Sequence, residues 1–250
     1  MQAPSSVLTS GFGVLVLAVA GLLVVATWHA GRRLGETPRG TLRWTALAVG
    51  VVAFVLGSSG VLAARGALAD MDSMPPTVFG VILPATVLTL VLAGSRFGER
   101  LVLGLSLEAL VGFQVFRVAV EVALWALHRE GIVPVEMTFE GLNFDILTGL
   151  TAPVMAWLIH RGRAPRALVG AWNTAGLVLL LTIVAIAVLA SPPFARVFEA
   201  TPRNTVITTA PFIWLPVVLV QAALFGHLLV FRWLRRHRAS APPSLAPPAG

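Results

Sequence analysis

Long apolar runs constrain the fold of this chain more than any other feature of its sequence. A helix that crosses the hydrocarbon core of a bilayer needs roughly 17–25 mainly apolar residues. Seven runs come close to or exceed that length: residues 7–30, 44–64, 77–94, 101–127, 144–160, 167–190 and 206–233. Only 12% of the 250 residues are charged, about half the usual share of roughly 25% in soluble domains. The sequence therefore predicts an all-α fold, a polytopic membrane bundle of seven transmembrane helices.

The runs follow one another without a soluble segment between them. We therefore expect one transmembrane domain over residues 1–238. The remaining residues, 239–250, are rich in Pro and Ala and contain too few apolar side chains to form a core, so we expect a disordered cytoplasmic tail there.

The basic residues are distributed unequally between the loops. All 18 are Arg, and 13 of them lie in the loops after the first, third, fifth and seventh runs, against four in the opposite set. Cytoplasmic loops of membrane proteins have an excess of basic residues. This bias predicts an external N-terminus and a cytoplasmic C-terminus, in a multi-pass membrane protein. Although the net charge is +7, short clusters between apolar runs do not form the basic stripe of a nucleic-acid-binding surface, so the expected partner is the lipid bilayer.

The sequence lacks Cys, Lys and Tyr entirely. Without Cys there is no thiolate nucleophile, no Cys-ligated metal and no attachment point for a c-type haem. Without Lys there is no Schiff base, which excludes a covalently bound retinal in spite of the seven predicted spans. These absences leave other cofactors open.

Two ionisable residues occur inside the fourth run. Arg117 and Glu121 are four residues apart, so in a helix they lie on one face and are spaced to pair. Charged groups are costly in hydrocarbon, and a paired Arg and Glu is cheaper than either residue alone. One interpretation is a structural salt bridge between helices. The alternative is a site in which Arg117 binds an anionic group and Glu121 holds or relays a proton.

The connection after the fourth run has an alternating pattern. Apolar Val135, Met137 and Phe139 alternate with polar residues that end at Glu140. A period of two predicts an extended segment with one face turned inward. Glu140 has no simple structural explanation in this pattern.

Asn143 and Asp145 come next, at the start of the fifth run. Asn143 is well placed to cap the helix, and the helix dipole favours a carboxylate at Asp145 in the first turn. Capping explains both residues without any binding role. If the segment folds into the mouth of the bundle, however, Glu140 and Asp145 approach Arg117 from the outer side.

A second polar cluster is expected nearer the cytoplasm, formed by Glu108, Asn173 and His227, with His29 on the same side. Hydrogen bonding within the core is one interpretation. A Glu and His pair can also form part of a metal site or a proton path, and His29 with His227 could ligate a b-type haem. No two of these residues have metal-motif spacing within one helix.

Four segments of the sequence have a recognisable pattern: FRVAVEVAL from Phe116, GIVPVEMTFEGLNFDILTGLTAP from Gly131, AWNTAGLVLLL from Ala171, and APFIWLPVVLVQAALFGHLL from Ala210. They resemble a group of bacterial multi-pass membrane proteins that have no assigned activity. The resemblance implies a bacterial inner-membrane protein and brings no substrate or mechanism. It draws attention to Arg117, Glu121, Glu140, Asn143, Asp145, Asn173 and His227.

The leading functional hypothesis is an outer-side polar pocket that binds or moves a small solute, an ion or a proton. Its predicted site residues are Arg117, Glu121, Glu140, Asn143 and Asp145. The alternatives are a membrane-embedded enzyme or redox protein with a metal or haem, and a non-catalytic membrane subunit.

Overall fold

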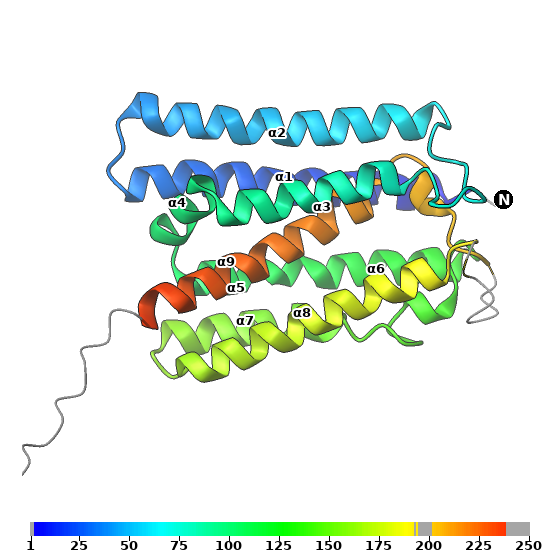
Figure 1. Ribbon diagram of the computed structural model, residues 1–250. Helices are drawn as coiled ribbons and strands as arrows, with labels where there is room; N and C mark the ends of the chain where they lie inside the picture. The colour runs from blue at the N-terminus through cyan, green and yellow to red at the C-terminus, as the bar shows by residue number, and fades with distance from the viewer. Residues whose placement is uncertain (1–2, 193, 195–201, 239–250) are drawn as a thin grey trace, which may run out of the picture.

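The computed structural model describes residues 3–192, 194 and 202–238, and every regular element in that part of the chain is a helix. Most of the helices run along one common axis, with chain reversals at two opposite ends (Figure 1). The elements are α1 Ser6–Arg33, α2 Pro38–Ala64, α3 Phe79–Gly94, α4 Arg96–Gly104, α5 Leu107–Gly112, η1 Phe113–Val115, α6 Phe116–Arg129, η2 Val135–Met137, α7 Ile146–His160, α8 Arg166–Leu189, η3 Val206–Thr208, η4 Leu215–Leu219 and α9 Val220–Arg238.

The prediction of seven spanning helices is wrong. In the described residues, five helical segments are long and apolar enough to cross a membrane, namely Ser6–Arg33, Pro38–Ala64, Leu107–Arg129, Arg166–Leu189 and Leu215–His237. A sixth is counted only if α3 and α4 form one span, and these two helices are bent by 58° at Ser95.

The predicted fifth span, 144–160, is the short helix α7. Its 15 residues rise about 22 Å at roughly 1.5 Å per residue, less than the hydrocarbon core of about 30 Å. In Figure 1, α7 occupies only about half the length of the bundle, and irregular chain covers the other half. Apolar composition alone did not distinguish a full span from a half-length helix.

The predicted fourth span, 101–127, also begins too early. Helix α4 ends at Gly104, and Leu105 is extended before α5 begins at Leu107. At Gly104, a side-chain Cβ would lie 2.6 Å from the Cα of Ala30. The absence of a side chain therefore permits α4 to pack directly on α1, away from the axis of the helix that follows.

The first two helices are longer than their apolar runs, and a capping residue precedes each of them. The Ser5 hydroxyl accepts the N–H of Leu8 at the start of α1, and Thr37 caps α2 by accepting the N–H of Gly40. Ser5 also donates its hydroxyl and backbone N–H to the Glu130 carboxylate beyond α6, and these bonds hold the pKa of Glu130 below its usual range.

The last span, predicted from residue 206, begins nine residues later. Residues 206–208 form the separate turn η3, and the helix starts as a π-helical turn, η4, that contains Pro216. Pro216 lies in the first turn, where a backbone N–H has no partner within the helix, so the missing N–H of proline removes no helical hydrogen bond there. Single π turns of this kind are common at functional sites.

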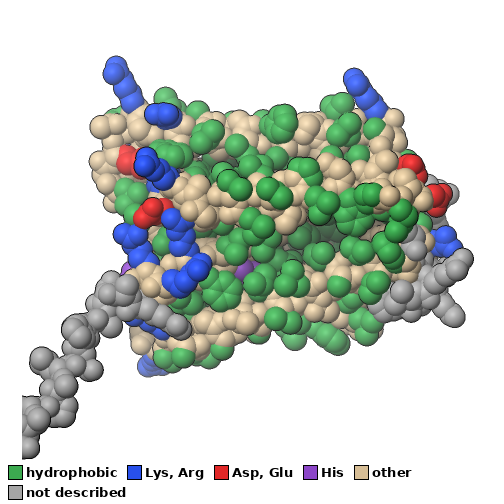
Figure 2. Space-filling model, in the orientation of Figure 1, with side chains coloured by type: hydrophobic (Ala, Val, Ile, Leu, Met, Phe, Trp, Pro, Cys, Tyr) green, Lys and Arg blue, Asp and Glu red, His purple; other side chains and the backbone are tan. Residues whose placement is uncertain are grey.

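On the face drawn in Figure 2, charged side chains gather at the two ends of the bundle, and hydrophobic side chains are spread over the surface between them. The loops with the 13 arginines all lie at one end, where the chain turns between α1 and α2 and between α7 and α8 and where α9 ends (Figure 1). A belt of apolar surface between two polar ends is the pattern of a multi-pass membrane protein. The predicted disordered tail, 239–250, lies outside the described residues.

Candidate functional site

The connection between α6 and α7, residues 130–145, runs back along α6 and makes three side-chain contacts with it. We call it the descending segment. At the outer end, Trp125 Nε1 donates to Glu140 Oε1 at 2.9 Å. One helical turn lower, the Asn143 amide donates to Glu121 at 2.5 Å. A further turn lower, Asp145 reaches Arg117. The three contacts are spaced four residues apart on α6, so they bring the irregular segment down to the level of Arg117.

This descending segment is not the extended chain that the alternating pattern predicted. Val135–Met137 forms a 3-10 turn, and both Met137 and Thr138 are buried. Irregular backbone at membrane depth must be enclosed by protein so that its polar groups are satisfied. Here Asn143 contributes twice, because its Nδ2 donates to the carbonyl of Met137 and its Oδ1 accepts the N–H of Asp145.

Arg117 is the centre of the site and is 2% exposed. Its Nε donates to Asp145 Oδ2 at 2.7 Å, and its Nη2 donates to Asp145 Oδ1, which makes a bidentate pair. Its Nη1 donates to His227 Nε2 at 2.8 Å, and both Nη atoms approach the carbonyl of Gly176 at 3.3–3.4 Å. A guanidinium has five N–H donors, and here all five have an acceptor. Arg117 therefore has no free donor for an external anion.

The hydrogen bonds of His227 define its protonation. A guanidinium donates and never accepts, so His227 Nε2 must present a lone pair to Arg117. The proton is therefore on Nδ1, which donates to Asn173 Oδ1 at 2.8 Å, while Asn173 Nδ2 donates back to the carbonyl of His227 at 3.1 Å. His227 is held as the neutral Nδ1–H tautomer, and it connects α8 and α9 to Arg117.

The predicted ion pair between Arg117 and Glu121 is not formed, since Asp145 is the carboxylate within ion-pair distance of Arg117. Glu121 is 1% exposed and accepts one hydrogen bond at Oε2, from Asn143. Its other oxygen, Oε1, accepts no hydrogen bond from any described residue. Glu121 is thus a buried carboxylate with an unused acceptor.

A cavity of about 270 Å³ adjoins this polar network. Its walls come from α3, α6, α8, η4 and α9 and are mainly apolar, with Phe79, Val120, Leu180 and Leu219 among them. Arg117, Glu121 and Asp145 are the charged residues in the described part of the lining. An apolar cavity with a few convergent polar groups is the usual form of a small-molecule site.

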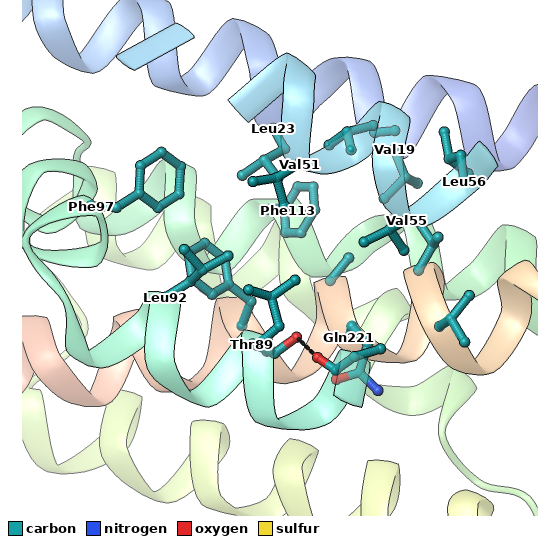
Figure 3. A pocket seen from close by; sticks show the side chains of 18 residues that line it. Val19, Leu23, Val51, Val55, Leu56, Thr89, Leu92, Phe97, Phe113 and Gln221 are labelled. Atoms are coloured by element: carbon teal, nitrogen blue, oxygen red, sulfur yellow. Dashed lines mark hydrogen bonds between the residues drawn. The ribbon is translucent and has the colours of Figure 1, made fainter. Parts of the chain in front are cut away.

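A second cavity, of about 120 Å³, is lined mainly by residues of α1, α2, α3 and α9 (Figure 3). Its lining is apolar except for Thr89 and Gln221, and the Thr89 hydroxyl donates to the carbonyl of Ala85. Gln221 lines both cavities and donates its Nε2 to Thr86 and to the carbonyl of Pro216. Gln221 therefore fixes α3 against the π turn, between the two cavities.

The structure joins the two clusters that the sequence analysis separated. Asn173 and His227, predicted nearer the cytoplasm, belong to the Arg117 network. Glu140 does not approach Arg117; it is exposed and bonded to Trp125. Glu108 is half-buried at the start of α5 and has no hydrogen-bond partner in the described residues.

A metal or haem site gains no support from this arrangement. His29 is exposed near the end of α1, and both ring nitrogens of buried His227 are already hydrogen-bonded, so the two histidines do not form an axial pair. The described residues contain no group of three or more His, Asp or Glu side chains that could hold a metal ion.

Three residues that form buried hydrogen bonds were not predicted from the sequence. Gly176 supplies a carbonyl to Arg117, and its position one turn after Asn173 on α8 was an available signal. Gln221 was not singled out. Arg100, assigned to a cytoplasmic loop, is 5% exposed and makes a bidentate pair with Glu36 at 2.6 and 2.9 Å. Arg100 and Glu36 both lie between the predicted apolar runs, where charged residues are expected to be exposed.

Comparison with known proteins gives one family match. A family model described as a domain of unknown function (DUF8737) matches residues 74–235, about two thirds of the chain. The match includes every residue of the Arg117 network and begins after α2. A search of curated proteins gave no match, and a search of solved structures gave none either.

Proposed function

The chain belongs to the family of the domain of unknown function DUF8737. From the geometry of the site, we propose that it binds a small, largely apolar molecule with a positively charged or strongly hydrogen-bond-donating group. The apolar part of the ligand occupies the cavity of about 270 Å³, and its polar group contacts Glu121. One observation supports this proposal above all others. Glu121 lines a mainly apolar cavity and has an oxygen that no described residue uses.

The charges around the cavity favour a cation over an anion. Arg117 and Asp145 neutralise each other as a bidentate pair, and the donors of Arg117 are all used. With Glu121 ionised, the three charged lining groups sum to one negative charge. A carboxylate held in an apolar surrounding is costly unless a partner neutralises it. A bound ammonium group would provide that partner.

The proposed location is the inner membrane, with the arginine-rich end in the cytoplasm. Long apolar helices and the bias of the 13 arginines support this orientation. Glu121 then lies between the Arg117 network and the external end of α6.

Binding of tritiated octylamine to the protein in nanodiscs tests the proposal, with empty nanodiscs as background. We expect saturable binding by the unaltered protein and at least about tenfold weaker binding by Glu121→Gln, which removes the charge and keeps an oxygen for Asn143. A tenfold loss corresponds to about 1.4 kcal/mol.

The matched control is Glu140→Gln, which changes an exposed carboxylate of the same segment, outside the cavity lining. We expect octylamine to bind this variant as it binds the unaltered protein. Tighter binding of octanoate than of octylamine, or equal octylamine affinity in Glu121→Gln, would overturn the proposal.

A further inference from the structure

We infer that the ligand reaches Glu121 from the lipid phase, through an opening between α3 and α8, and is therefore a membrane-partitioned amphipathic amine. The inference depends on the proposed function and adds to it the route of entry and the class of ligand.

Helices α3 and α8 border the cavity but do not form a packed pair. α3 packs on α9, η4 and α4, whereas α8 packs on α9, α7 and η2. In Figure 1, α9 runs diagonally between α3 and α8. One residue of each helix marks the opening: Leu83 on α3 and Leu181 on α8 both line the cavity, and they are 57% and 56% exposed.

Buried residues line the cavity towards each of its two ends. Towards the external end, buried Met71, Met137 and Ile207 line it, and they come from three different connecting segments. Towards the arginine-rich end, the bonded network of Arg117 and Asp145 forms its boundary. An aqueous solute would have to displace one of these boundaries, whereas an apolar molecule in the bilayer meets only two leucine side chains.

The chemistry of this route selects an amphipathic amine. An opening formed by leucines at membrane depth admits a molecule already dissolved in the hydrocarbon, and excludes strongly hydrated ions. Inside the cavity, the apolar wall contacts the hydrocarbon chain of the ligand, and Glu121 Oε1 accepts a hydrogen bond from an N–H group of the ligand. A single-chain amine satisfies both requirements: it enters as the neutral amine, and a proton passes from the Glu121 carboxyl group to its nitrogen, so that an ammonium pairs with a carboxylate.

The test narrows the opening and measures the rates of binding. In the double variant Leu83→Trp with Leu181→Trp, we expect both association and dissociation of octylamine in nanodiscs to slow by about tenfold, with a dissociation constant within about threefold of the original. A route used for entry and exit changes both rates together and leaves the equilibrium nearly unchanged.

The matched control is Leu90→Trp with Val178→Trp, on the same two helices. Both residues are exposed, at 49% and 54%, and neither lines the cavity. We expect this variant to retain the original rates. Unchanged rates in the Leu83 and Leu181 variant, with octylamine still bound, would overturn the lipid route and leave the proposed function intact. Absence of octylamine binding to the unaltered protein would overturn both.

Discussion

At the scale of single residues, Arg117 shows how a helix can hold a charged side chain that is 2% exposed. The sequence predicted its partner as Glu121, because a spacing of four residues permits pairing along a helix. Asp145 is the actual partner and makes a bidentate contact, a geometry that suits the planar guanidinium. Glu121 is left available because a carboxylate distant in sequence takes its place.

Asp145→Asn tests this pair. The substitution keeps the size of the side chain but leaves the buried guanidinium of Arg117 without its carboxylate. Removing one partner of a buried ion pair typically costs about 3–5 kcal/mol, and we expect a loss of that order in the free energy of unfolding. Reversible unfolding in mixed detergent and dodecyl sulfate measures it.

Glu99→Gln is the control for that experiment. The Glu99 side chain is 40% exposed and pairs with Arg236 at 2.8 Å and with Arg232 at 3.5 Å, and exposed ion pairs typically contribute about 0–1 kcal/mol each. Similar losses in the two variants would show that the Arg117 pair has no special structural role.

At the scale of elements, Gly176 permits α8 to pack closely against its neighbours, and its carbonyl accepts hydrogen bonds from Arg117. A Cβ at Gly176 would lie 2.8 Å from His227 Cε1 and 2.8 Å from Thr148 Cγ2. Helix α8 can therefore approach α7 and α9 this closely only with glycine at that position.

Gly176→Ala is expected to destabilise the protein by about 1–3 kcal/mol, the usual cost of adding a methyl group to a packed core. Gly170→Ala, on the same helix, is the matched control because its Cβ would meet Leu234 at an ordinary 3.8 Å. Unfolding in the same detergent mixture compares them. Equal stability of the two variants would contradict this account of the α8 packing.

At the scale of the whole molecule, the arginine-rich end and the opposite end provide sites for a topology test. The chain has no cysteine, so single cysteines can be labelled without background. We expect a membrane-impermeant maleimide to label Ser73→Cys in intact cells, and to label Arg163→Cys only after the membrane is permeabilised, because Arg163 lies among the proposed cytoplasmic arginines. Labelling of Arg163→Cys in intact cells would reverse the proposed orientation.

The sequence by itself determined the composition-driven features of this protein. Apolar runs of membrane length identified the helices, and the distribution of arginine assigned the polar loops to two sets. The sequence also singled out Arg117, Glu121, Asn143, Asp145, Asn173 and His227 as unusual, because polar groups in apolar runs are costly and need partners. These properties depend on residue type and local spacing, which the sequence contains.

Only the tertiary structure decided which polar groups meet. The descending segment brings Asp145 to Arg117, and α8 and α9 bring Gly176 and His227 to the same guanidinium. Hydropathy predicts α3 and α7 as full spans because both segments are apolar, although α7 has only 15 residues and α3 is followed by a 58° bend into α4. Partner choice and helix length depend on packing between segments that are distant in sequence, and that packing leaves Glu121 with a free oxygen at the cavity.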